Sequence, residues 1–181
     1  VTYFFENVQK FAFYEELNAV CLKNTGRSVS ELVDESEHRT VVRNLLGDEG
    51  LSYGRLPKGL LKFHSYGDGS VRTPLEEHLV EGALYAESKS AVNIHFTVSP
   101  EHRTLFEQKV EDTKSAYGEK FGVGFNVSFS EQKSSTDTVA ANPDNTPFRN
   151  EDGSLLFRPG GHGALIQNLN EIPADVIFIK N

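Results

Sequence analysis

Two kinds of hydrophobic periodicity divide the chain. Early in the sequence, apolar residues recur every three to four positions, which is the period of an amphipathic helix. The pattern predicts a helix over residues 2–22 and a second over residues 30–46. A capping box, Ser28-Val29-Ser30-Glu31, precedes the second helix, and Gly47 follows it. We expect these helices to form an accessory segment, residues 1–49.

Beyond residue 50 the pattern alternates between strands and helices. Runs rich in β-branched and aromatic residues predict strands over 92–98 and 123–129. A second capping box at Thr73-Pro74-Leu75-Glu76 and the start signal Ser99-Pro100-Glu101 predict helices over 74–88 and 100–121. The remaining segments predict short strands at 60–63 and 155–157, a short helix over 164–170 and an apolar strand over 175–180.

This alternation predicts an α/β domain over residues 50–181. We expect three layers, with a mainly parallel sheet and helices on both of its faces. Residues 92–98, 123–129 and 175–180 are expected to be neighbours in that sheet.

Composition narrows the classes of function. The 181 residues carry 18 Lys and Arg against 26 Asp and Glu, a net charge of −8, which argues against nucleic-acid binding through phosphate contacts. No apolar run approaches the roughly 20 residues of a membrane span, so we expect no membrane partner. The single cysteine, Cys21, fits a cytoplasmic protein and is expected to be buried. The chain has no Met, and we expect it to be part of a longer protein.

The loops that follow strands are the places to look for chemistry, because ligands of parallel sheets lie beyond the carboxyl ends of the strands. Lys58 lies before the first expected strand, in a Pro-Lys-Gly turn, and offers an ammonium for a phosphate; the alternative is an exposed turn lysine. The loop Gly160-Gly161-His162-Gly163 permits close backbone approach and precedes a helix whose N–H groups suit an anion. Its alternative is a tight strand-to-helix turn.

Polar residues also follow the strand at 123–129. The segment from Gln132 to Thr138 carries hydroxyls and a carboxylate suited to a sugar or ribose, and its alternative is a solvated loop. The six histidines lack metal-ligand spacing, so no metal ligand is expected in this chain. His95 is expected to be a hydrogen-bonded histidine within its strand.

The order of these motifs resembles that of the GT-A nucleotidyltransferases that make sugar nucleotides, in particular the UDP-sugar pyrophosphorylases. Pro57-Lys58-Gly59 is similar to their Pro-Lys-Gly segment, and Gln132 to a Gln near a strand end. Gly160-Gly161-His162-Gly163 is similar to their Gly-Asn-Gly-Gly loop, with His162 in place of the Asn. Residues 176–181 resemble the strand that precedes their metal-binding Asp.

The resemblance implies an incomplete GT-A fold and a sugar-1-phosphate nucleotidyltransferase, with a nucleoside triphosphate and a sugar phosphate as substrates. It implies a catalytic role for Lys58, which would neutralise phosphate charge, and substrate contacts from Gln132, Gly160, Gly161, His162 and Gly163. Mg²⁺ is implied, held by a carboxylate outside this chain. Because the glycine-rich first loop and that carboxylate are missing, we expect this chain alone to be inactive. Replacement of a surface residue such as Lys109 is expected to leave triphosphate binding unchanged.

Two longer sequence motifs resemble those of an uncharacterised bacterial family known only as a domain of unknown function. The motifs are Leu-Pro-Lys-Gly-Leu-Leu-Lys-Phe-His and Phe-Arg-Pro-Gly-Gly-His-Gly-Ala-Leu, and the resemblance covers the whole chain. Two other functions stay open. One is a non-catalytic nucleotide- or sugar-binding module on the same fold, and the other is an interaction domain with an empty cleft.

Overall fold

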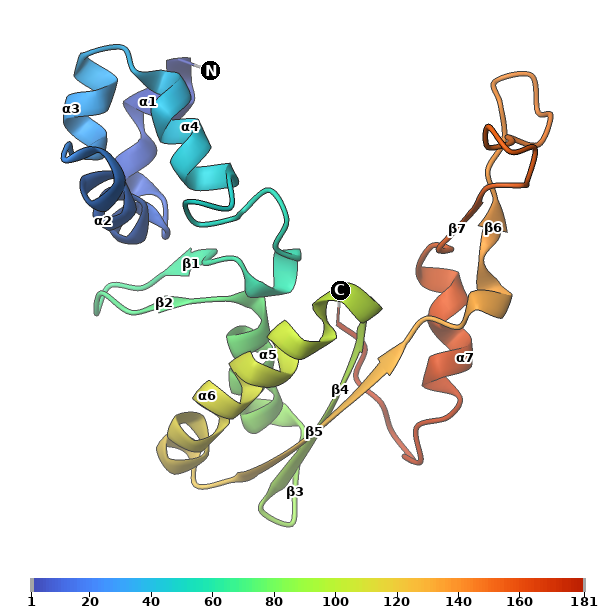
Figure 1. Ribbon diagram of the computed structural model, residues 1–181. Coiled ribbons are helices and arrows are strands. Elements are labelled where there is room, and N and C mark those ends of the chain that lie inside the picture. Colours follow the sequence, from blue (N-terminus) through green and yellow to red (C-terminus); the bar gives the residue numbers. More distant parts are fainter. Residues whose placement is uncertain (1, 181) are drawn as a thin grey trace.

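The first part of the chain is a small helical unit. The computed structural model describes residues 2–180. The unit contains α1 (Thr2–Glu6), η1 (Val8–Lys10), α2 (Tyr14–Thr25), α3 (Val29–Asp34) and α4 (His38–Leu46) (Figure 1). Its core consists of the buried side chains of Phe5, Val8, Leu17, Cys21, Val29, Leu32, Val41 and Leu45. The burial of Cys21 is confirmed.

Each long helix expected here is broken, for a local reason. The Asn7 side chain donates to the Tyr3 carbonyl (2.9 Å), an acceptor that a continuing helix would use, and α1 ends at Glu6. Ser36 adopts a positive φ of 62°, which separates α3 from α4. The predicted capping box at Ser28 is confirmed, because Ser28 Oγ accepts from the Glu31 N–H and the Glu31 carboxylate accepts from the Ser28 N–H.

The central part is a mixed α/β unit. Its elements in order are η2 (Lys58–Leu60), β1 (His64–Ser65), β2 (Val71–Arg72), α5 (Pro74–Tyr85), β3 (Glu87–Ser88), β4 (Ala91–Val98), η3 (Pro100–His102), α6 (Arg103–Phe121) and β5 (Gly124–Glu131). The expected strand at 60–63 is wrong. Residues 58–60 form a 3-10 turn, and the first strand begins only at His64, in the antiparallel β1–β2 hairpin.

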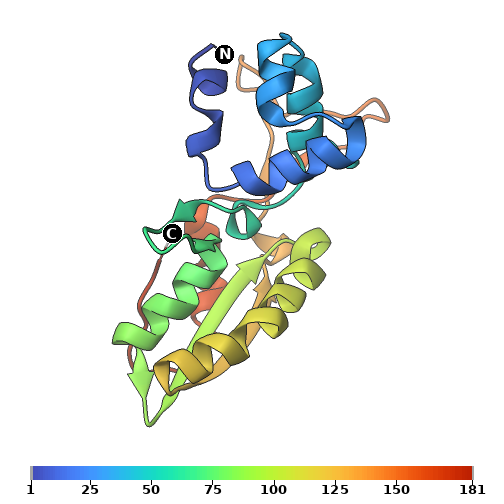
Figure 2. The ribbon, with the colours of Figure 1, turned by 90° about the vertical axis from the view of Figure 1, so that its left-hand side faces the viewer.

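The parallel pairing of the two main strands is confirmed. β4 and β5 pair in parallel from Ala91–Gly124 to Val98–Glu131, and β3 pairs antiparallel with the start of β4. Both α5 and α6 lie on the same face of this sheet (Figure 2). They bury Leu75, Leu79, Phe106 and Val110 against the apolar side chains of β4 and β5.

The opposite face of the sheet is polar. It carries Asn93, His95 and Thr97 from β4 and Asn126, Ser128 and Ser130 from β5. Strand residues alternate between the two faces of a sheet, so the alternating pattern that places apolar residues under α5 and α6 also places polar residues on the opposite face. The expected three-layer arrangement, with an apolar core on both faces of the sheet, is therefore not confirmed by residues 2–180.

The last part of the chain adds short elements around the carboxyl end of β5. They are η4 (Ser134–Thr136), β6 (Thr138–Val139), β7 (Phe157–Arg158), η5 (His162–Leu165) and α7 (Ile166–Leu169). β7 pairs with β6 in a separate antiparallel ribbon, so the strand expected at 155–157 does not join the main sheet. Residues 175–180 form no strand, which corrects that prediction. On the edge of β4 away from β5, β3 pairs only with Ala91 and Val92, and no strand of residues 2–180 lies between the rest of that edge and segment 175–180.

Candidate functional site

Lys58 begins the 3-10 turn η2 and its side chain is exposed. The turn packs on α5 and on the first part of α6. A Cβ atom at Gly59 would lie 2.8 Å from the Phe106 ring, so the glycine permits close packing there. Because α6 follows β4, this contact brings Lys58 near the carboxyl end of the parallel sheet.

Gln132 and Gly160 are held together directly beyond β5. In the amide orientation that satisfies both side-chain atoms, Gln132 Oε1 accepts from the Gly160 N–H at 2.8 Å, and Nε2 donates to the Gly160 carbonyl at 3.3 Å. The Thr136 hydroxyl also donates to Gln132 Oε1, at 3.1 Å. The side chain thus pairs with the backbone of Gly160 as a neighbouring strand would, which fixes the start of the glycine loop at the end of β5.

The three glycines of the loop differ in their surroundings. A Cβ atom at Gly160 would lie 2.9 Å from both the Thr136 carbonyl and the Ala164 methyl group. At Gly161 and Gly163 a Cβ atom would meet nothing within 4 Å, and Gly161, His162 and Gly163 are all exposed. Gly160 is therefore required for packing, whereas Gly161 and Gly163 have open space beside them for a ligand.

The structure brings the predicted residues to one end of the sheet in two groups. Gln132 and the glycine loop form one group, and Lys58 lies apart from them. No hydrogen bond or ion pair within residues 2–180 joins Lys58 to the loop.

A cation that the sequence did not single out lies between the strand ends and α6. Arg103, in the first turn of α6, bonds Glu107 (2.8 Å) and Glu131 at the end of β5 (3.4 Å).

A second polar group lies on the open face of the sheet. His95 contacts the Ser128 hydroxyl through Nδ1 and the Ser130 hydroxyl through Nε2, each at 2.8 Å, which confirms it as a hydrogen-bonded strand histidine. Burial lowers the pKa of His95, which favours the neutral ring. Asn168 of α7 donates to Ser130 Oγ (2.8 Å) and to the Glu131 carbonyl (2.7 Å). These bonds attach the helix that follows the glycine loop to β5.

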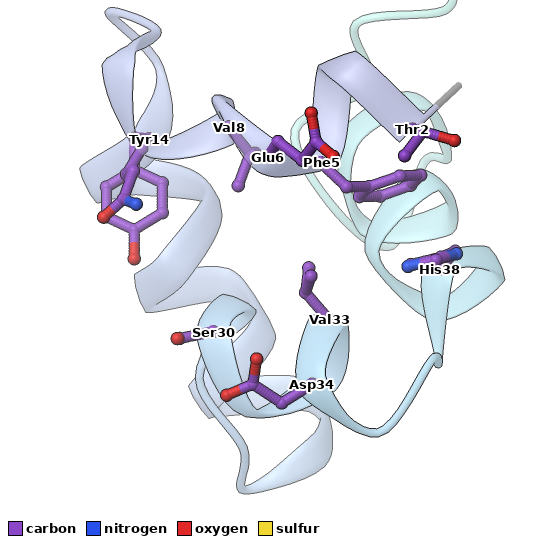
Figure 3. Close-up of a pocket in the computed structure, with 10 residues that line it drawn as sticks. Thr2, Phe5, Glu6, Val8, Tyr14, Ser30, Val33, Asp34 and His38 are labelled. Carbon is purple, nitrogen blue, oxygen red and sulfur yellow. The ribbon is translucent and has the colours of Figure 1, made fainter.

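A hollow of about 430 Å³ lies in the helical unit, away from all these residues (Figure 3). Phe5 and His38 stack at one side of it, with ring centroids 4.1 Å apart. Ser30 and Asp34 lie on another side, on α3. None of the residues predicted from the sequence lines it. Its charged side chains, Glu6 and Asp34, do not suit a phosphate.

Residues 2–180 contain no group of three or more His, Cys, Asp or Glu side chains arranged to hold a metal ion. No helix in the same residues has the length and apolar character needed to cross a membrane.

Comparison with known proteins gives one match. Residues 1–181 match the model of the family described as domain of unknown function DUF4301, so the chain belongs to that family. No curated protein and no solved structure matches the chain.

Proposed function

We propose that this chain is part of a sugar-1-phosphate nucleotidyltransferase. In the proposed reaction, a phosphate oxygen of the sugar phosphate attacks the α-phosphorus of a nucleoside triphosphate. The bond to the β-phosphate bridging oxygen breaks, and pyrophosphate leaves with that electron pair. Such a reaction depends on positioning and charge neutralisation and requires no protein nucleophile.

The pairing of Gln132 with the backbone of Gly160 is the observation that supports the proposal most. It holds a glycine-rich loop beyond the carboxyl end of a parallel strand, which is where ligands of open α/β sheets bind. The loop leaves space beside Gly161 and Gly163, so the backbone is accessible to a flat or bulky ligand. A structural turn would need only the packing seen at Gly160.

Each residue has a separate role in the proposal. Lys58 neutralises phosphate charge as an exposed point cation. Gly161, His162 and Gly163 lie against the base or the sugar. Gln132 positions the loop through Gly160. For these roles, the bound substrates must reach from Lys58 in η2 to the glycine loop. The proposal therefore requires Lys58 and the glycine loop to face one cleft.

Magnesium belongs to the proposed reaction, but residues 2–180 do not fit it. No group of three potential ligands lies together there, so we derive no step through the ion. We expect its carboxylate ligand outside the described residues.

A screen for pyrophosphate release tests the proposal. The full-length protein is assayed with each nucleoside triphosphate in combination with each of a set of sugar 1-phosphates. Turnover of one pair supports the enzyme, and the 181-residue chain alone is expected to show none. Binding of a nucleotide without turnover would instead support a non-catalytic module, and no binding by the full-length protein would contradict both.

Two substitutions locate the site. Lys58→Ala should weaken triphosphate binding by about ten- to a hundred-fold, because a charge-assisted contact contributes about 1.5–3 kcal/mol. Lys120→Ala is the matched control, since Lys120 is exposed in the last turn of α6, far along that helix from Phe106. Gly161→Val should weaken binding while leaving the melting temperature unchanged, because the added side chain enters open space. A loss of stability without a loss of affinity would show a purely structural turn.

A further inference from the structure

A histidine lies between two serine hydroxyls on the face of the sheet opposite α5 and α6 (Figure 2). His95 belongs to β4, and both serines belong to β5. The distance from His95 Nδ1 to Ser128 Oγ is 2.8 Å, and that from Nε2 to Ser130 Oγ is also 2.8 Å. A serine in contact with a histidine that a third group orients is the arrangement of an activated nucleophile. None of these residues belongs to the nucleotidyltransferase site proposed above.

The distances around Ser128 indicate where its hydrogen lies. Ser128 Oγ has two acceptors within reach, His95 Nδ1 at 2.8 Å and the Ile94 carbonyl at 3.4 Å. Its single hydrogen is donated to the nearer acceptor, Nδ1, because hydrogen bonds weaken with length. Burial lowers the pKa of His95, so the ring is neutral at pH 7 and carries one N–H. That N–H is therefore on Nε2, and Nδ1 is free to accept the Ser128 proton.

The other side of the ring is held through Ser130. Ser130 Oγ accepts from His95 Nε2 and, at 2.8 Å, from Asn168 Nδ2. Its own hydrogen faces Thr97 Oγ1, 3.3 Å away. Asn168 is only 3% exposed, and its Nδ2 also donates to the Glu131 carbonyl at 2.7 Å, which fixes the amide. Ser130 thus has a partner for its hydrogen and for both of its lone pairs, so it orients the histidine and is not the attacking group.

Ser128 is open to a substrate and has amide groups beside it. It is exposed, and Asn126 lies two positions before it on the same face of β5, about 7 Å away along the strand. Asn126 Nδ2 donates to Asn93 Oδ1 at 3.1 Å, and Asn93 Nδ2 has no hydrogen-bond partner within residues 2–180. Side-chain amides placed in this way can donate to the oxygen that becomes negative when a hydroxyl attacks a carbonyl group.

We propose that Ser128 is the nucleophile of a second active site, which hydrolyses carboxylic esters through an acyl-enzyme. Ser128 Oγ bonds to the ester carbonyl carbon as its proton passes to His95 Nδ1. The bond to the alcohol oxygen then breaks, the electron pair stays on that oxygen, and His95 returns the proton to it. Water attacks the acyl group in the same way and gives one proton to His95 Nδ1, which passes it to Ser128 Oγ as the acid leaves. Asn93 and Asn126 stabilise the oxyanion in both steps.

A fluorophosphonate probe tests the nucleophile in the 181-residue chain. The attacking serine oxygen displaces fluoride from phosphorus and keeps the label, which peptide mass mapping locates. Ser128 should carry the label, and Ser128→Ala should lose it. His95→Gln should slow labelling by about a hundred-fold or more, since a general base contributes about 10²–10⁴-fold. The controls Ser88→Ala, at an exposed position in β3, and His102→Gln should leave the rate unchanged. Absence of label at Ser128, or equal labelling of Ser88, would overturn the proposal.

Hydrolysis of p-nitrophenyl acetate tests the substrate class. The chain should release p-nitrophenol in a burst followed by steady turnover, because the acyl group is first transferred to Ser128. Ser128→Ala should abolish the burst, and Ser88→Ala should keep it. Labelling of Ser128 without ester hydrolysis would contradict the proposed reaction.

Replacing the attacking oxygen with sulfur gives a result that does not depend on a substrate. Because His95 takes the thiol proton, iodoacetamide should alkylate Ser128→Cys roughly ten-fold or more faster than Ser88→Cys at pH 7. Cys21 is buried and adds no background in the native chain. Adding His95→Gln should remove the difference. Adding Ser130→Ala should also slow the reaction and Ser130→Thr, which keeps the hydroxyl, should restore it, whereas a merely structural Ser130 would alter only the melting temperature. Equal alkylation at positions 128 and 88 would refute the activation of Ser128 by His95.

Discussion

Replacing Lys109 with alanine should destabilise the α/β unit, although the sequence presents Lys109 as an ordinary helix-surface residue. Lys109 lies on α6, and its ammonium is 3.1 Å from the carboxylate of Glu76, whose side chain is only 11% exposed. Glu76 also accepts from the Thr73 N–H and hydroxyl, both at 2.9 Å, in the capping box that begins α5. Lys109→Ala, which we expect to leave triphosphate binding unchanged, should therefore lower the stability of the unit.

The magnitude follows from burial. Exposed ion pairs contribute about 0.2–1 kcal/mol, whereas breaking a fully buried pair costs about 3–5 kcal/mol. With Lys109 28% and Glu76 11% exposed, we expect a loss of about 1–2 kcal/mol, or about 2–8 °C in melting temperature. Lys114→Ala is the matched control, because Lys114 pairs with the exposed Glu111 on the same helix. It should change stability by less than about 0.5 kcal/mol.

Urea unfolding in a double-mutant cycle isolates the pair. Glu76→Gln preserves a capping residue but removes the charge, so adding Lys109→Ala to that variant should cost little. The pH dependence gives a second check. Burial raises the pKa of Glu76, but the bonds from Thr73 and the Lys109 ammonium outweigh it and hold that pKa below its usual 4.5. The stabilisation is thus present above pH 4.5 and is lost as the pH falls through the lowered value, so the effect of Lys109→Ala should shrink there. If Lys109→Ala and Lys114→Ala prove equally mild at pH 7, the reasoning is wrong.

Three further changes have defined outcomes. Gly82→Val should cost about 1–3 kcal/mol in urea unfolding, because a Cβ atom there would already lie 2.8 Å from Val92; a neutral result would mean that α5 moves freely on the sheet. The Cys21 thiol is fully buried and burial raises its pKa, so a thiol-reactive reagent should label it only after unfolding. Rapid labelling of the native chain would contradict the burial of Cys21 in the core of the helical unit. Asn168→Asp should destabilise more than Asn168→Ala at pH 7, as measured by thermal melting. Both changes remove the donor to the Glu131 carbonyl, but only Asp places a buried negative charge beside that carbonyl oxygen; the reverse order would refute this reasoning.

Features that depend on near neighbours in the chain could be predicted from the sequence. The capping boxes at Ser28 and Thr73 formed as expected because their hydrogen bonds join residues three positions apart. The β-branched runs predicted β4 and β5 and their parallel pairing, because a strand–helix–strand unit has few ways to pack. Gln132 and the glycine loop were found as candidates because each follows an expected strand, and Lys58 because it lies in a Pro-Lys-Gly turn.

Features that depend on distant partners needed the tertiary structure. Segment 175–180 has the composition of a strand, but a strand exists only beside another strand, and the edge of β4 nearest to it is free. The pairing of Gln132 with Gly160 and the ion pair of Lys109 with Glu76 join separate elements, and no local pattern encodes them. The sequence alone determined which backbone conformations are favourable at each position. Only tertiary packing decided which face of the sheet is covered by helices, which charged side chains are buried and which edge of the sheet is unpaired, because burial and strand pairing depend on residues far apart in the chain.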